Sequence, residues 1–123
     1  MKSLIRWEKK LATKQIKDAL SYLGLLLDKH KIKEIEQKLI ESSRNITIYK
    51  AADLIRASRD RAIPGFQKEV SEQLQLILLQ KKINPVILVT ADTTLYIGDG
   101  YHRICACYSI DDAIEIACVH IEI

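Results

Sequence analysis

The chain has 123 residues, 48% of them apolar, and a formal net charge of +3. Such a chain is long and apolar enough to bury the core of one compact domain, which excludes a disordered tail. Its apolar runs are far shorter than the ~20 residues of a membrane-spanning helix, and residues 1–10 are charged too often for a secretory signal. These patterns predict a cytoplasmic protein with no membrane partner, although a receptor-read export signal, for instance to a host cell, would escape them.

The basic residues are concentrated near the N-terminus. Lysine and arginine outnumber aspartate and glutamate in residues 1–50, whereas acidic residues are in excess in residues 51–123. This asymmetry suits an acidic partner, but a solvated, lysine-rich helical face is the simpler interpretation.

Apolar residues recur at helical spacing through the first 45 residues. A first pattern contains Leu4, Trp7 and Leu11, and a second runs from Ile16 to Leu27. Asp28 is a candidate N-cap for a further helix that ends before residues 42–45. We expect residues 1–45 to form a helical hairpin or three-helix unit. Its apolar stripe must cover either the C-terminal sheet or a second copy of the chain, in a homodimer.

The middle of the chain is expected to be mixed. Residues 46–48 alternate like a short strand, and residues 49–57 follow as a short helix. Residues 58–65 read as a loop because they contain Pro64-Gly65. Apolar spacing then predicts one long helix over residues 66–82, which Asn84-Pro85 stops.

The C-terminal third changes to strand periodicity. We expect strands at residues 86–90, 95–97 and 114–121, a turn at residues 92–94, and a helix at residues 101–109. Together with the preceding segments they predict an α+β fold: a small mixed sheet with helices on one face, over residues 46–123.

The junction between the second strand and the last helix is the candidate site. Glycines allow close backbone approach, and a helix N-terminus attracts anions, so a phosphate is the expected guest. In the alternative interpretation Asp99 pairs with Arg103 or caps the helix, and the turn is only structural. The candidate phosphate-binding or nucleotide-binding residues are Gly98, Asp99, Gly100, His102 and Arg103, with supporting basic residues Arg59, Arg61, Lys81 and Lys82.

No catalytic residue or metal site is expected from the remaining residues. Cys105, Cys107 and Cys118 form no metal-binding spacing, so we expect reduced, buried thiols. His102 and Asp99 match no metal-ligand pattern with nearby acidic residues. The low aromatic content of 6% offers no stacking platform, so nucleic acid is not an expected partner.

The segment Pro85-Val86-Ile87-Leu88-Val89 followed by Ile97-Gly98-Asp99-Gly100-Tyr101-His102-Arg103-Ile104-Cys105-Ala106 resembles the ParB/sulfiredoxin-like superfamily. The resemblance covers roughly residues 46–123 and is most specific over residues 85–108. Gly100, Arg103 and Ala106 match the G-x-x-R-x-x-A turn with which the ParB branch holds nucleotide phosphates. Gly100, His102 and Arg103 match the G-C-H-R turn of sulfiredoxins, which holds ATP phosphates beside a catalytic cysteine.

Two departures from the family pattern matter for function. Tyr101 stands where sulfiredoxins have their nucleophilic cysteine. The ParB branch also carries a second nucleotide motif and a helix-turn-helix DNA reader, for which a chain ending at Ile123 leaves no room. The resemblance therefore favours a small, non-enzymatic bacterial regulatory protein that binds a protein partner and acts, for example, as an enzyme inhibitor. The alternative is an ATP- or CTP-binding protein that uses the Gly100–Arg103 turn, including a ParB-like nuclease or nucleotidase.

Overall fold

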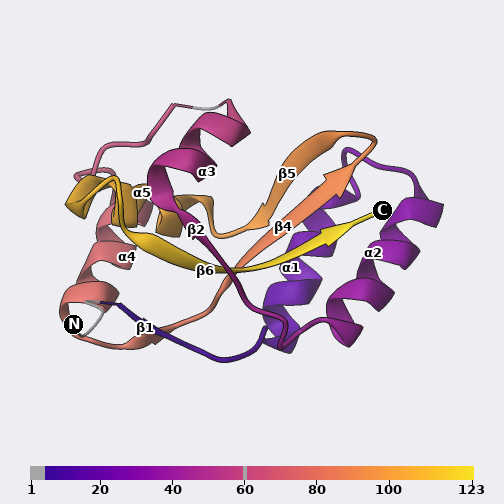
Figure 1. Ribbon diagram of the computed structural model, residues 1–123, viewed down its shortest axis with the longest axis horizontal. Helices are drawn as coiled ribbons and strands as arrows, with labels where there is room; N and C mark the ends of the chain where they lie inside the picture. The colour runs from indigo at the N-terminus through magenta and orange to yellow at the C-terminus, as the bar shows by residue number, and fades with distance from the viewer. Residues whose placement is uncertain (1–4, 60) are drawn as a thin grey trace.

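The computed structural model describes residues 5–59 and 61–123. Both helices and strands occur along the length of this part of the chain (Figure 1). In chain order the elements are β1 (Arg6–Trp7), α1 (Thr13–Leu23), α2 (Lys29–Glu41), β2 (Thr47–Lys50), α3 (Ala51–Ser58), α4 (Lys68–Leu78), β3 (Lys82–Ile83), β4 (Val86–Ala91), β5 (Thr94–Asp99), α5 (Tyr101–Ile110) and β6 (Glu115–Glu122).

The main sheet has four strands in the order β2-β6-β4-β5. Strand β6 pairs parallel to β4 and antiparallel to β2, and β4 pairs antiparallel to β5. The fold is therefore α+β with a small mixed sheet, as the sequence predicts. Strands β2 and β5 form its two edges.

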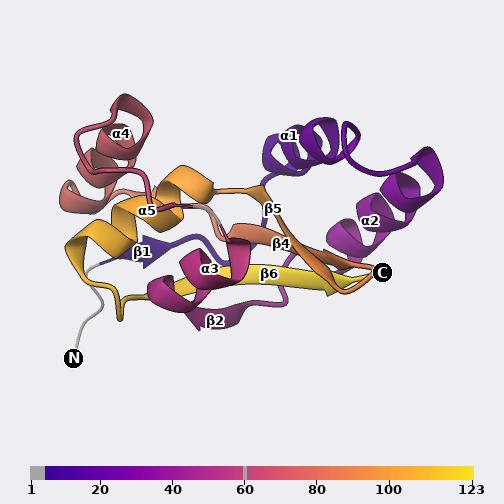
Figure 2. The same cartoon turned by 90° about the horizontal axis from the view of Figure 1, so that it is seen from above.

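Both faces of the sheet are covered. The helices of residues 46–123 pack on one face, as predicted, and the N-terminal helices cover the other. Along β4, Val86 and Leu88 belong to one apolar core, which also contains side chains of α3, α4 and α5. Ile87 and Val89 belong to a second core, with side chains of α1 and α2. Because successive side chains of a strand point to opposite faces, the two cores lie on opposite sides of the sheet. Figure 2 shows α1 and α2 on one side and α3 on the other.

The N-terminal helices cover the sheet of their own chain. Leu23 of α1 and Leu39 of α2 are fully buried in the second core, together with Val119 of β6. Asp28 caps α2 as expected, since its carboxylate accepts a hydrogen bond from the Lys31 N–H at 2.9 Å. The apolar stripe of these helices is expected to cover either the sheet or a second copy of the chain, and it packs against the sheet.

The expected helix around Trp7 is wrong within the described residues, and Leu4 lies outside them. Arg6 and Trp7 instead form β1, which pairs parallel to Lys82 and Ile83 of β3. Three apolar positions are too few to establish a helical period, and the pairing with β3 depends on residues far along the chain, so local periodicity misleads here.

Several other boundaries differ from the sequence prediction, and three of them lie next to the candidate site or end an element. Tyr49 belongs to β2, so α3 starts two residues later than expected, at Ala51. Helix α4 ends at Leu78, because Gln80 takes a left-handed conformation with φ of 57°. Gly98 lies inside β5, so the turn before α5 is narrower than predicted. Across residues 5–59 and 61–123, no helix has the length and apolarity needed to cross a bilayer.

Candidate functional site

The turn between β5 and α5 consists of a single glycine. Gly100 follows the last residue of β5 and precedes Tyr101, the first residue of α5, with φ of 105°. A Cβ atom at this position would lie 2.8 Å from Val86 Cγ2. Both the left-handed backbone and the neighbouring strand therefore require glycine here.

Gly98 serves the packing of α1 on the sheet. A Cβ atom at Gly98 would lie 3.1 Å from Ile87 Cγ2, 3.4 Å from Ala19 Cβ and 3.4 Å from Leu23 Cδ1. The missing side chain thus lets α1 approach β5 closely. The close approach that the sequence assigns to a ligand is made by a helix of the same chain.

Arg103 is bound inside the protein. Its side chain is only 14% exposed. The guanidinium donates from Nη1 to the Asn84 carbonyl at 2.9 Å and from Nε to Gln73 Oε1 at 3.2 Å. Asp99 Oδ2 lies 3.9 Å from Nη1. Burial lowers the pKa of Arg103, and Asp99 opposes that shift. The guanidinium thus ties α5 to α4 and to the segment before β4.

His102 and Asp99 both line a groove beside the turn, and Asp99 also pairs with Arg103, as the structural interpretation of the turn expects. The pKa of Glu69 is lowered chiefly by hydrogen bonds from its own backbone and from Gln67, and also by the charge of His102. His102 therefore lies near the start of α4, and its side chain is exposed. Of the two basic residues expected to bind phosphate at the turn, His102 has an exposed side chain and Arg103 has a largely buried one.

The groove at this site follows β5 over its whole length, and we call it the β5 groove. Its volume is about 560 Å³. Every residue of β5, Thr94–Asp99, lines it. The remaining lining residues are Tyr22 and Leu26 from α1 and the turn after it, Ser58 from α3, and Gly100, Tyr101 and His102 at the start of α5.

The supporting basic residues lie in different parts of the fold. Arg59 caps the C-terminus of α3 and lines a smaller cavity of about 210 Å³ with Thr93, Thr94 and Leu95, beside the β5 groove. The carbonyl of Arg61 accepts a hydrogen bond from the Tyr101 hydroxyl. Lys81 and Lys82 follow α4, and Lys82 pairs with β1, so they line neither cavity.

Three tyrosines that sequence analysis did not select line the β5 groove: Tyr22, Tyr96 and Tyr101. The low aromatic content of the chain gave no reason to select them, because composition does not show which distant residues lie together in the fold. Tyr96 and Tyr101 flank the glycine turn, which is the local signal that was present. Tyr22 comes from α1, and no local signal places it beside β5.

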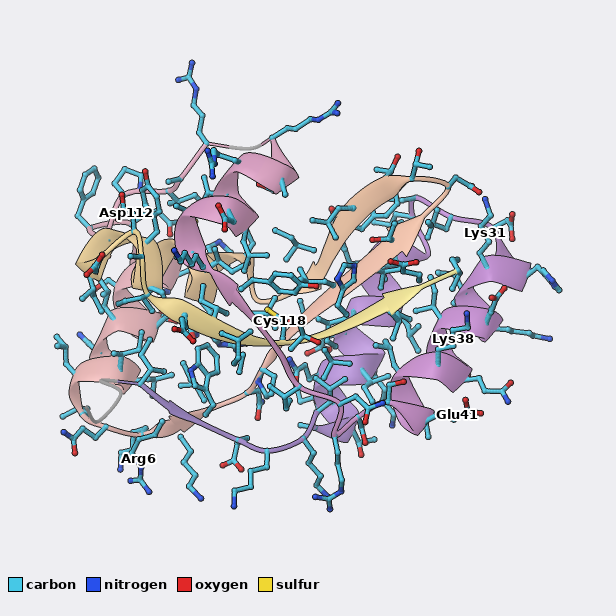
Figure 3. All side chains as sticks on the ribbon, viewed as in Figure 1. Arg6, Lys31, Lys38, Glu41, Asp112 and Cys118 are labelled. Carbon is cyan, nitrogen blue, oxygen red and sulfur yellow. The ribbon has the colours of Figure 1, made fainter. Side chains whose placement is uncertain are left out.

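Lys31 and Asp92 hold the far end of the β5 hairpin against α2. Lys31 Nζ lies 2.5 Å from Asp92 Oδ2. Figure 3 shows Lys31 at the end of α2 that lies near the tip of the hairpin. This pair, with the fit of Gly98 against α1, holds β5 at a defined distance from the N-terminal helices.

The cysteines are buried, as expected, and Figure 3 shows Cys118 at the middle of the sheet. Burial raises the pKa of Cys107 and of Cys118 to about 12. Thiols of this kind are weak nucleophiles at neutral pH because the thiolate is scarce. In the described part of the chain, no three His, Cys, Asp or Glu side chains are grouped as metal ligands.

His120 is a packing histidine within the sheet. Its Nδ1 lies 2.7 Å from the Tyr49 hydroxyl and its Nε2 lies 2.8 Å from Thr90 Oγ1. The three side chains connect β2, β6 and β4 across the sheet.

Comparison with known proteins identifies no relative: no protein-family model, curated protein or solved structure matches the chain. The resemblance to the ParB/sulfiredoxin-like superfamily therefore stays a prediction.

Proposed function

We propose that the chain is a small, non-enzymatic regulatory protein that acts by binding a protein partner, with inhibition of an enzyme as its mode of action. The observation that carries the proposal is the shape and lining of the β5 groove. It extends along a complete strand and has apolar side chains at its rim, among them Tyr22 and Leu26, which are 48% and 50% exposed. Exposed apolar side chains gathered at a groove are typical of interaction sites.

The position of Arg103 supports binding of a protein over binding of a phosphate. In the predicted phosphate site this guanidinium provides a two-pronged donor. In the structure Asn84 and Gln73 accept its hydrogen bonds. The turn then serves to join β5, α5 and α4, and the exposed groove beside it is the surface left for a partner.

Affinity capture from the native cell extract, followed by reconstitution, tests the proposal. We expect one stoichiometric protein, and the purified partner should bind the purified chain saturably and lose activity if it is an enzyme. Leu26→Asp should weaken binding, since Leu26 lines the groove. Leu25→Asp is the matched control, because Leu25 is 84% exposed and lies outside the lining. The proposal would be contradicted if the purified partner failed to bind the wild-type chain. It would also be contradicted if the partner bound both variants as tightly as the wild type.

One observation favours nucleotide or phosphate binding as a second candidate. The first turn of α5 and three tyrosines line the same groove, and aromatic rings can stack on a base. ATP, CTP or pyrophosphate at millimolar concentration should then raise the melting temperature of the wild type, and His102→Ala should reduce the increase. Equal melting curves with and without these ligands would rule this candidate out.

A further inference from the structure

The outer edge of β5 offers backbone hydrogen-bonding groups. Strand β5 lies at one end of the sheet and pairs with β4. Asp92 and Thr93 form a two-residue turn with φ of 50° and 65°. In such a hairpin the flanking pair, here Ala91 and Thr94, shares both ladder hydrogen bonds, and the pattern then alternates.

This alternation decides which groups face outward. Tyr96 opposite Val89 continues the hydrogen-bonded pairs with β4. Leu95 and Ile97 occupy the intervening positions, so their N–H and C=O groups point away from β4, into the β5 groove. The groove thus contains a row of alternating donors and acceptors at strand spacing.

The two edges of the sheet differ in their protection. Charged side chains and short length are the usual means of blocking an edge strand from pairing. Strand β2 is four residues long and ends in the charged residue Lys50. Strand β5 is six residues long and, like β2, has one charged residue at its end, Asp99, so the two edges differ in length. The β5 edge is the longer of the two and lies along the β5 groove, which leaves space beside it for a further strand.

The walls of the groove indicate the chemistry of that strand. Tyr22 and Leu26 form an apolar wall on the side of α1. Arg59 flanks the hairpin end of β5, beside Thr94 and Leu95, and among the described residues its guanidinium forms no ion pair. An extended segment along β5 would place alternate side chains toward these two walls.

We propose that the β5 groove binds an extended segment of the partner protein, which adds a strand to the β5 edge. An apolar side chain of the segment packs against Tyr22 and Leu26, and an acidic side chain faces Arg59. The inference rests on the proposed function and names the chemistry of its partner. Backbone hydrogen bonds supply affinity in this mode of recognition, and alternate side chains supply specificity.

Peptide selection on the full-length chain tests the inference without knowledge of the partner. The probe is a phage-displayed library of short random peptides, and the selected sequences are then synthesised. We expect apolar residues at alternate positions and at least one Asp or Glu. N-methylation of alternate peptide amides should weaken binding about tenfold, and N-methylation of the intervening amides should not. The inference would be overturned if N-methylation weakened binding at amides that do not alternate along the peptide. It would also be overturned if the apolar residues of the selected peptides recurred at helical spacing.

Variants of the chain locate the bound peptide. Leu26→Asp should weaken binding about tenfold and Leu25→Asp should leave it unchanged. Arg59→Glu should weaken binding of the acidic peptide, whereas Arg44→Glu, an equal charge change on an exposed residue before β2, should not. A dimer of the chain that Leu26→Asp disrupts would assign the groove to a second copy and overturn the inference.

The two proposals fail in distinguishable ways. The chain could inhibit a purified native partner that binds the Leu26→Asp and Arg59→Glu variants as tightly as the wild type. In that case the regulatory function stands and the β5 site is wrong. If peptides bind β5 with the expected periodicity but the native extract yields no partner, the site stands and the regulatory function is wrong.

Discussion

Arg103 joins three parts of the chain through one side chain. Its hydrogen bonds reach Gln73 of α4 and the Asn84 carbonyl before β4, and Asp99 at the end of β5 lies 3.9 Å away. A buried guanidinium needs such partners, because a polar group that loses water without gaining hydrogen bonds costs free energy. The residue that the sequence assigns to a ligand therefore has a structural role whether or not the turn binds one.

Arg103→Met tests this role by keeping the length of the side chain while removing its donors. We expect the free energy of unfolding to fall by about 1 to 3 kcal/mol, because the partners of the guanidinium lose their hydrogen bonds. Urea denaturation measures the change. Arg56→Met is the control: the Arg56 side chain is 79% exposed, and its pair with Asp53 should contribute at most about 1 kcal/mol. Equal effects of the two substitutions would contradict a structural role for Arg103.

The buried thiols make stability depend on pH in the alkaline range. Burial raises the pKa of Cys107 and Cys118 from 9.0 to about 12. Above about pH 9 the unfolded chain releases thiol protons that the folded chain keeps, so the free energy of unfolding falls until the folded thiols titrate near pH 12. Urea midpoints between about pH 8 and pH 10 should therefore decrease, and Cys107→Ala with Cys118→Ala should make the decrease shallower. If the urea midpoint fell with pH equally in the wild type and in the double cysteine variant, groups other than these thiols would be the cause.

At the scale of elements, α4 ends in a Schellman motif that has no glycine. The Lys81 N–H donates to the Leu76 carbonyl at 3.0 Å, and the Gln80 N–H donates to the Ile77 carbonyl at 3.0 Å. Gln80 occupies the left-handed position of this motif, where glycine is the usual residue. Because that signal is missing, the sequence extends the predicted helix to residue 82.

Replacing Gln80 with glycine should stabilise the protein. A left-handed φ strains a residue with a Cβ atom, so we expect Gln80→Gly to raise the free energy of unfolding by about 0.5 to 1 kcal/mol. Thermal and urea denaturation measure the gain. Gln75→Gly, inside α4, is the matched control and should destabilise by about 1 kcal/mol. A loss of stability in both variants would contradict the assigned helix end.

At the scale of the whole molecule, the two cores share their central strands. Leu88 of β4 belongs to the first core and Val89 to the second, and Cys118 and Val119 of β6 are divided in the same way. Neither the N-terminal helices nor the remaining helices can leave the sheet without exposing a buried face of these strands. The N-terminal helices thus share a core with the sheet.

This arrangement predicts one cooperative unfolding transition. Leu39→Ala in the second core should cost about 2 to 5 kcal/mol and Ile104→Val in the first about 0.5 to 1.5 kcal/mol. Both should shift the same midpoint. Trp7, the single tryptophan, packs against the first core, so its fluorescence and the far-UV circular dichroism should give coincident curves. Separate transitions, with Leu39→Ala moving one of them, would show that residues 1–45 unfold independently.

The sequence by itself determined the features that arise within a few residues. The Asp28 cap, the strands of the C-terminal third and the glycine before α5 all follow from local backbone chemistry. These signals suffice for the α+β class and for the place of the candidate turn, because hydrogen bonds along one helix or around one turn depend on neighbouring residues.

The tertiary structure decided the features that depend on distant partners. It turned Trp7 into a strand residue beside Ile83, directed Arg103 inward to Asn84, and brought Tyr22 alongside β5. Periodicity shows that a face is apolar but does not show what covers it. Which surface a face or a charged side chain meets is settled by packing across the whole chain, and the β5 groove exists only because α1, α3 and α5 meet around one sheet edge.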